Sequence, residues 1–142
     1  MAQPLVEAVS GIVHEPAQTE GLGVDLTLAA VHRVSGPGRV DFGGGELEAA
    51  ALDPVATRLR DPADDYEWWD LDAGQYLLSY NEALEVAADR RPVLQTRDEV
   101  LARGGFHPTL HVSALEPVPF AVGGQGIRLK ENARVSTLLD SC

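Results

Sequence analysis

The sequence predicts an all-β domain, a sandwich or a distorted barrel of short strands, and three observations support this fold class. Several short segments alternate between apolar and polar residues with a period of two, which is the pattern of a strand with one buried face. Fourteen glycines and nine prolines interrupt these segments at nearly regular spacing. The chain of 142 residues is long enough to bury one hydrophobic core, so we expect a single domain over residues 1–142.

In the N-terminal part, a short helix and then a clear strand are predicted. Residues 5–13 place apolar side chains near helical spacing, which predicts the helix. Residues 15–20 are polar and contain a proline, so we expect a connector there. Residues 24–28 alternate between Val or Leu and Asp or Thr, which predicts a strand with one buried face. The Gly-Pro-Gly sequence at 36–38 ends this strand.

The next part of the chain gives weaker patterns. Residues 40–42 resemble a short strand before a flexible turn of three glycines. Residues 46–59 contain several alanines, and the pattern leaves open whether they form a short helix or a pair of strands. Residues 60–67 are rich in Asp and Pro, so we expect a surface loop.

The second half of the chain predicts a series of short strands. These expected strands cover residues 68–71, 75–80, 83–87, 93–95, 109–114, 127–130 and 134–138. Pro117 and Pro119 restrict the segment around them to a sheet edge or a bend, because proline cannot donate a hydrogen bond to a neighbouring strand. We expect the last two strands to close the chain as a hairpin around Glu131-Asn132.

The composition excludes several classes of partner. The net charge of −11 repels phosphate backbones, and the ten arginines and one lysine form no cluster along the chain, so we expect no nucleic-acid binding. No apolar run is long enough to span a bilayer, and the first residues lack the basic region of a signal peptide, so we expect no membrane partner. Cys142, the single cysteine, cannot close an intrachain disulfide, which favours a reducing cytoplasm.

His107 and His111 are spaced four residues apart, as in some helical metal sites. Pro108 and the two preceding glycines oppose a helix, and four residues of a strand span roughly 13 Å. Two zinc bonds of about 2 Å each cannot bridge that length. We therefore expect these histidines to be hydrogen-bonded or exposed.

Two acidic features suggest a binding site. Asp25 lies between Val24 and Leu26 on the predicted strand, where it could hold a water molecule of a hydrated magnesium ion or accept backbone hydrogen bonds. The charged segment Arg97-Asp98-Glu99 follows a predicted strand at the place where we expect a binding loop. Its two carboxylates have the wrong charge for binding a triphosphate.

Four segments, in this order and spacing, resemble the dUTPase and dCTP-deaminase superfamily, in particular the deaminase-like dUTPases of archaea. They are Gly23 to Leu28, Leu71 to Leu78 followed by Glu82, Arg97, and Ala133 to Leu138. The resemblance implies a β-clip fold and a homotrimer that binds a deoxynucleotide at sites between its subunits. It also implies that Asp25 belongs to a strand of the site and that Arg97 binds the phosphates.

The chain departs from the family pattern at three positions of the site. Asp98 and Glu99 occupy the positions of two phosphate-binding serines, and Ser113 occupies that of the catalytic aspartate. Carboxylates only accept hydrogen bonds, and like charges about 4 Å apart repel by about 4 kcal/mol at an effective dielectric constant of 20. A serine at position 113 cannot act as the general base, a role typically worth at least a hundredfold in rate.

Three hypotheses follow from these departures. The first is a catalytically degenerate dUTPase- or dCTP-deaminase-like protein, and whether the chain is an enzyme at all stays open. The second is a divergent, metal-dependent triphosphate diphosphatase or deaminase in which Asp25, Asp98 and Glu99 bind Mg²⁺. The third is an interaction module without enzymatic activity on the same fold.

Overall fold

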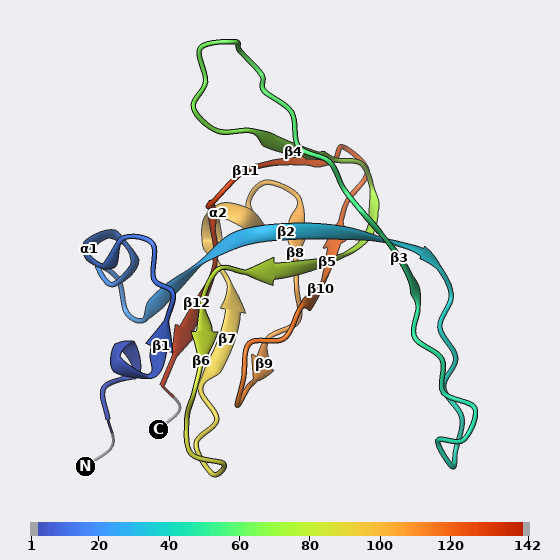
Figure 1. The fold of residues 1–142 in the computed structure, drawn as a ribbon, viewed down its shortest axis with the longest axis horizontal. Helices are drawn as coiled ribbons and strands as arrows, with labels where there is room; N and C mark the ends of the chain where they lie inside the picture. Colours follow the sequence, from blue (N-terminus) through green and yellow to red (C-terminus); the bar gives the residue numbers. More distant parts are fainter. Residues whose placement is uncertain (1–2, 141–142) are drawn as a thin grey trace.

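A computed structural model, which describes residues 3–140, shows a strongly curled β-sheet that forms a half-barrel around an apolar core (Figure 1). The strands are β1 (Val9–Ser10), β2 (Val24–Gly36), β3 (Ala51–Pro54), β4 (Trp68–Leu71), β5 (Gly74–Tyr80), β6 (Ala83–Leu84), β7 (Val93–Thr96), β8 (Gly105–Phe106), β9 (Leu110–His111), β10 (Val118–Val122), β11 (Ile127–Lys130) and β12 (Arg134–Leu139). The helical segments are a 3-10 turn at Leu5–Ala8, α1 (Glu15–Gln18) and α2 (Asp98–Leu101). The predicted all-β, dUTPase-like fold is therefore confirmed.

The long strand β2 organises the sheet. The strand order of the main sheet is β8-β10-β5-β2-β12-β7-β9, and the pairs between them are antiparallel. The first residues of β2 pair with β12, the middle pairs with β5, and the end pairs with β3. Two small sheets, β1 with β6 and β4 with β11, complete the fold. Among residues 3–140, no helix has the length and apolar character needed to cross a bilayer.

The core is built from the alternating apolar side chains that the sequence pattern identifies. Leu26 and Leu28 on β2 and Leu78 on β5 are completely buried. Phe120 on β10 and Leu138 on β12 are buried to the same degree. Burying a side chain of this size stabilises the fold by about 1.5–3 kcal/mol.

The second face of β2 is also buried, which the alternation alone did not predict. The side chains of Asp25 and Thr27 point away from the apolar core, yet both are buried because the N-terminal segment packs over them. Gln18 of α1 donates its side-chain amide to the Asp25 carbonyl at 2.9 Å and to the Glu82 carboxyl group at 2.8 Å. Glu82 also accepts from the Thr27 amide at 2.8 Å and its hydroxyl at 2.6 Å. This buried network attaches α1 to the sheet.

The predicted N-terminal helix is wrong beyond its first turn. The 3-10 turn Leu5–Ala8 gives way to β1, which pairs with β6, and Gly11 adopts a left-handed φ of 79°. Residues 15–18, predicted as a connector, form α1 instead. Pro16 lies in the first turn of α1, where its missing N–H is not needed.

The segment between β2 and β3 also differs from its prediction. Residues 40–42 form no strand, because only Arg39 and Glu48 bridge across this loop. Of the two alternatives for residues 46–59, the structure contains a strand, β3, paired with the end of β2. The turn at Gly36-Pro37-Gly38 is confirmed as the end of β2.

The predicted C-terminal hairpin is wrong. β11 pairs with β4 and β12 pairs with β2 and β7, so the two consecutive strands belong to different sheets. Asn132, with a φ of 63°, redirects the chain between them. The strands predicted at 83–87 and 109–114 are shorter than expected. Only two residues of each pair with a neighbouring strand, β6 with β1 and β9 with β7.

The restriction imposed by proline on β10 is confirmed. β10 pairs with β5 along its whole length but with β8 only through Ala121 and Val122. Pro119 therefore lies in the half of the strand that has a single neighbour.

Cutting the buried network at Glu82 should destabilise the fold. Replacing Glu82→Ala leaves the buried donors of Gln18 and Thr27 without an acceptor, and we expect the free energy of unfolding to fall by about 3 kcal/mol in urea titrations. Glu85→Ala is the matched control, because Glu85 is exposed nearby and should change this quantity by less than about 0.5 kcal/mol. Equal effects of the two substitutions would contradict the role of the network.

Candidate functional site

The segment predicted as a binding loop is a single helical turn. Arg97 is the N-cap residue of α2, and Asp98 and Glu99 occupy its first turn. Acidic side chains are favoured there, because the helix N-terminus carries a partial positive charge. Val100 is buried and anchors the turn against the core.

Four of the sequence-predicted site residues, Asp25, Arg97, Asp98 and Glu99, line one small hollow beside α2. Its volume is about 250 Å³. The lining residues are Glu20, Gly21, Leu22, Asp25, Gln95, Arg97, Asp98, Glu99, Thr137 and Leu139. We call it the acidic hollow. β2 supplies Asp25, β12 supplies Thr137, and the turn after β7 supplies Arg97 and its two acidic neighbours.

Asp25 is held by side chains from two other elements. One carboxylate oxygen accepts from the Thr137 hydroxyl at 2.7 Å, as the register of β2 and β12 places these residues opposite each other. The other oxygen lies 3.2 Å from Arg134 Nη1 and 3.6 Å from Arg97 Nε. The partners of this carboxylate are thus side-chain donors, whereas the sequence left backbone donors and a hydrated magnesium ion as the two alternatives.

These contacts extend into an alternating row of charges. Arg134 also contacts Glu20 at 3.0 Å, and Arg97 contacts Glu99 at 3.3 Å. The hydrogen bond that Arg134 donates to Glu20, with the added charge of Asp25, raises the pKa of the Arg134 guanidinium above its ordinary value. Four carboxylates and one guanidinium, that of Arg97, line the acidic hollow, so the charge balance of its lining is −3.

Arg97 is already occupied by these internal partners. Its Nε faces Asp25, its Nη2 faces Glu99, and its Nη1 lies 3.5 Å from the Arg134 carbonyl oxygen. The Arg97 side chain is mostly buried, while that of Glu99 is largely exposed. A phosphate that binds Arg97 must therefore displace Glu99.

The residues of the acidic hollow do not form a ready metal site. Within residues 3–140, no group of three or more His, Cys, Asp or Glu side chains is arranged to hold a metal ion. Asp25, Asp98 and Glu99 line the same hollow, but both oxygens of Asp25 already face Thr137 or arginine. A magnesium ion at these three residues would have to displace those contacts, so the arrangement does not fit it.

Ser113 lies apart from this cluster. It is exposed on the bend that follows β9, and it lines neither the acidic hollow nor its larger neighbour.

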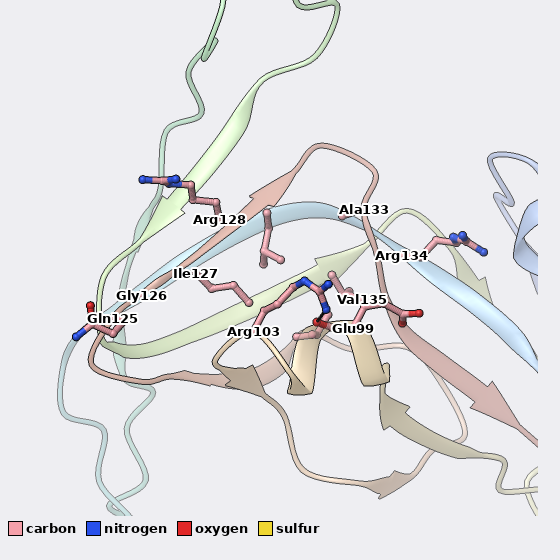
Figure 2. A pocket seen from close by; sticks show the side chains of 11 residues that line it. Glu99, Arg103, Gln125, Gly126, Ile127, Arg128, Ala133, Arg134 and Val135 are labelled. Atoms are coloured by element: carbon pink, nitrogen blue, oxygen red, sulfur yellow. Dashed lines mark hydrogen bonds between the residues drawn. The ribbon is translucent and has the colours of Figure 1, made fainter.

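A second, larger hollow adjoins the first at Glu99, and Figure 2 shows its side chains. Its volume is about 520 Å³. The lining residues are Glu99, Val100, Arg103, Gln125, Gly126, Ile127, Arg128, Leu129, Ala133, Arg134 and Val135. We call it the arginine hollow. Figure 2 shows Arg103 over the hollow, with Arg128 extending outwards at one end and Arg134 at the other.

No pattern in the sequence indicated the arginine hollow. Its arginines come from the segment after α2, from β11 and from the start of β12, so they are dispersed along the chain and form a cluster only after folding. Three arginines against Glu99 give a charge balance of +2 in a chain whose net charge is −11. Buried apolar side chains, including Val100, Ile127 and Val135, form its floor.

His107 takes part in a buried hydrogen-bonded chain, which confirms the expectation that this histidine is hydrogen-bonded. Its Nδ1 lies 2.7 Å from the Pro108 carbonyl, so Nδ1 carries the proton and Nε2 accepts. The Ser136 hydroxyl, 2.7 Å from Nε2, then donates to it, and Tyr80 donates to Ser136 at 2.6 Å. Burial raises the pKa of Tyr80 and lowers that of His107, although the bond to Pro108 opposes the second shift.

The chain is similar to a protein of Methanosarcina acetivorans that is named "Probable deoxyuridine 5'-triphosphate nucleotidohydrolase". The two sequences are 26% identical over 127 residues, which cover 86% of this chain and 71% of the relative. No family model matches the chain. The similarity supports a relationship to the dUTPases, in agreement with the curled all-β fold.

The lowered pKa of His107 predicts a pH dependence of stability. An unfolded histidine binds a proton as the pH falls through about 6.5, whereas folded His107 stays neutral to lower pH, so protonation favours unfolding. The contribution of His107 is complete above about pH 6.5 and declines below it. In urea unfolding at pH 7.5 and 5.5, we expect His107→Gln to lose less stability over this interval than the wild type.

The exposed His111 provides the control for this measurement. His111→Gln should retain the pH dependence of the wild type, because His111 lies outside the buried hydrogen-bonded chain of His107, Ser136 and Tyr80. The difference attributable to His107 cannot exceed about 1.4 kcal/mol per pH unit. An unchanged slope in His107→Gln would contradict the assignment.

Proposed function

We propose that the chain is a dUTPase-like protein of deoxynucleotide metabolism that retains the fold and has lost triphosphate chemistry. The proposal is supported by the similarity to the archaeal relative and by the curled all-β sheet. We further propose that it acts in the cytoplasm as a homotrimer and that any nucleotide it binds is a deoxynucleotide.

The internal neutralisation of Arg97 is the observation that carries this proposal. The guanidinium expected to bind phosphate faces Asp25 and Glu99, and Asp98 lies in the same hollow. A phosphate entering this hollow meets carboxylates with a net negative balance, and like charges about 4 Å apart repel by about 4 kcal/mol at an effective dielectric constant of 20. Solvent screening reduces this value for the exposed carboxylates.

Ser113 supports the same proposal, because a serine at this position cannot supply the general base. A hydroxyl group with an ordinary pKa cannot take a proton from water at neutral pH, whereas a carboxylate can. Ser113 is also exposed away from the two hollows.

A metal-dependent diphosphatase or deaminase is the second candidate. It is favoured by one observation, since Asp25, Asp98 and Glu99 line a single hollow. The engagement of both Asp25 oxygens opposes it. A non-enzymatic interaction module would also show no turnover. Nucleotide binding distinguishes the two, because a degenerate dUTPase-like protein is expected to bind a deoxynucleotide and an interaction module is not.

A turnover assay tests the proposal. A more specific test is whether a variant with serines at positions 98 and 99 binds nucleotide more tightly. We expect no pyrophosphate or ammonia release from dUTP or dCTP with Mg²⁺ or Mn²⁺ at high protein concentration. Asp98→Ser combined with Glu99→Ser replaces two acceptors with hydroxyl donors and frees Arg97 Nη2. We expect this variant to bind dUTP at least about tenfold more tightly than the wild type in calorimetry.

The control for the binding experiment removes the same charge elsewhere. Asp65→Ser combined with Asp89→Ser changes two exposed carboxylates outside both hollows and should leave dUTP binding unchanged. Turnover by the wild type that Asp98→Ala and Glu99→Ala abolish would replace the proposal with the metal-dependent enzyme. Failure of the variant with serines at positions 98 and 99 to bind dUTP would favour the interaction module.

A further inference from the structure

A preformed arm projects from the body of the protein between β2 and β3. We define the arm as residues 37–50, and Figure 1 shows it extending away from the sheet. Arg39 and Glu48 close its base through two backbone hydrogen bonds, at 2.9 and 3.1 Å, and an ion pair at 3.1 Å. At the tip, the Gly44 amide donates to Asp41 at 3.0 Å. These contacts give the arm a defined shape.

The arm exposes large apolar side chains at its tip. Phe42 is completely exposed, Val40 is 90% exposed and Leu47 is 59% exposed. These three exposed apolar side chains lie within eight residues of one loop, so apolar surface is concentrated on the arm. Surfaces of this kind on soluble proteins typically mark contacts with another molecule.

The arm tip does not cover the chain's own apolar hollow. In Figure 1 the tip points away from β11 and α2, the elements that border the arginine hollow. A contact between the tip and an arginine hollow therefore requires a second molecule.

The arginine hollow has the properties that such a contact requires. Its floor is apolar, with Val100, Ile127 and Leu129 buried, and its volume is about 520 Å³. At its rim, Arg103 donates from Nη1 to the Glu99 carbonyl oxygen at 2.9 Å and forms no ion pair within residues 3–140. A guanidinium with free donors above an apolar floor fits a partner that combines an aromatic ring with a carboxylate.

The charges of the two surfaces are complementary. Residues 39–48 of the arm carry Asp41, Glu46 and Glu48 against Arg39, a balance of −2. Two of the three arginines that line the arginine hollow already form ion pairs, Arg128 with Asp70 and Arg134 with Glu20 and Asp25. Arg103, which forms no ion pair within residues 3–140, is therefore the cation of the hollow that the acidic arm residues complement. Opposite charges at a contact steer association and disfavour wrong pairings.

We propose that the arm of one copy of this chain docks in the arginine hollow of a second copy, with Phe42 on the apolar floor and the acidic arm residues near Arg103. The two surfaces are different patches of one chain, so the contact is head-to-tail, and a rotation of about 120° between neighbouring copies would close it into the proposed trimer. The inference deepens the proposed homotrimer and rests on it. It also places residues of a second copy beside Glu99 and Arg134, next to the acidic hollow.

Sedimentation velocity at micromolar concentration tests the contact. We expect the wild type to sediment as a multiple of the 15.2 kDa chain and Phe42→Asp to weaken the assembly by tenfold or more, as for a central aromatic contact. Arg103→Glu should weaken it in the same direction. Tyr66→Asp and Arg60→Glu are matched controls on an exposed loop outside both surfaces and should leave the assembly unchanged.

The two possible failures are distinguishable in this experiment. A monomeric wild type at these concentrations would remove both the homotrimer and the docking contact. A wild-type trimer that persists in Phe42→Asp would overturn the docking contact alone and leave the proposed homotrimer intact.

Crosslinking between copies locates the contact. In a Cys142→Ser background, we mix a Phe42→Cys copy with a Gln125→Cys copy and add a short bifunctional maleimide. We expect a crosslinked dimer from this mixture and none when Tyr66→Cys replaces Phe42→Cys. If the protein assembles but Phe42→Cys and Gln125→Cys do not crosslink, the placement of the arm is overturned.

Discussion

The site of this protein depends on the compensation of one buried carboxylate. Asp25 is largely removed from water, and a buried charge is tolerated only when it is paired and hydrogen-bonded. Its partners come from different elements: Thr137 and Arg134 belong to β12, and Arg97 begins α2. The need to compensate Asp25 therefore fixes how the end of the chain, the turn after β7 and the first residues of β2 meet.

Sequence patterns predicted the strands of this fold better than they predicted which elements pair with or pack against each strand. The alternation in residues 24–28 identified β2 and the core positions Leu26 and Leu28, because apolar burial follows the local period of a strand. The same pattern implied one exposed face, whereas this face is covered: Gln18 of α1 donates to the Asp25 carbonyl, and Thr27 donates to Glu82. The C-terminal hairpin failed for a related reason, since pairing is decided between strands and not within a segment.

The sequence indicated four residues of the candidate site but not the contacts that these residues make. Asp25, Arg97, Asp98 and Glu99 do line one hollow, although the last three form a helical start and not a loop. The arginine hollow had no signal along the chain, because its arginines are brought together by α2, β11 and β12. A short charged segment thus indicated the place of a site, and only the fold shows which charges are already paired.

The contacts of Arg97 show how the proposed loss of triphosphate chemistry leaves the scaffold intact. Its Nε faces the buried Asp25 and serves the fold, while its Nη2 faces the largely exposed Glu99. An exposed ion pair typically contributes between zero and about 1 kcal/mol, so the Glu99 contact adds little stability. Replacing a hydroxyl with a carboxylate at position 99 would therefore oppose phosphate binding without disturbing the compensation of Asp25. The fold and the proposed phosphate site use different nitrogens of one guanidinium, which lets the second change independently of the first.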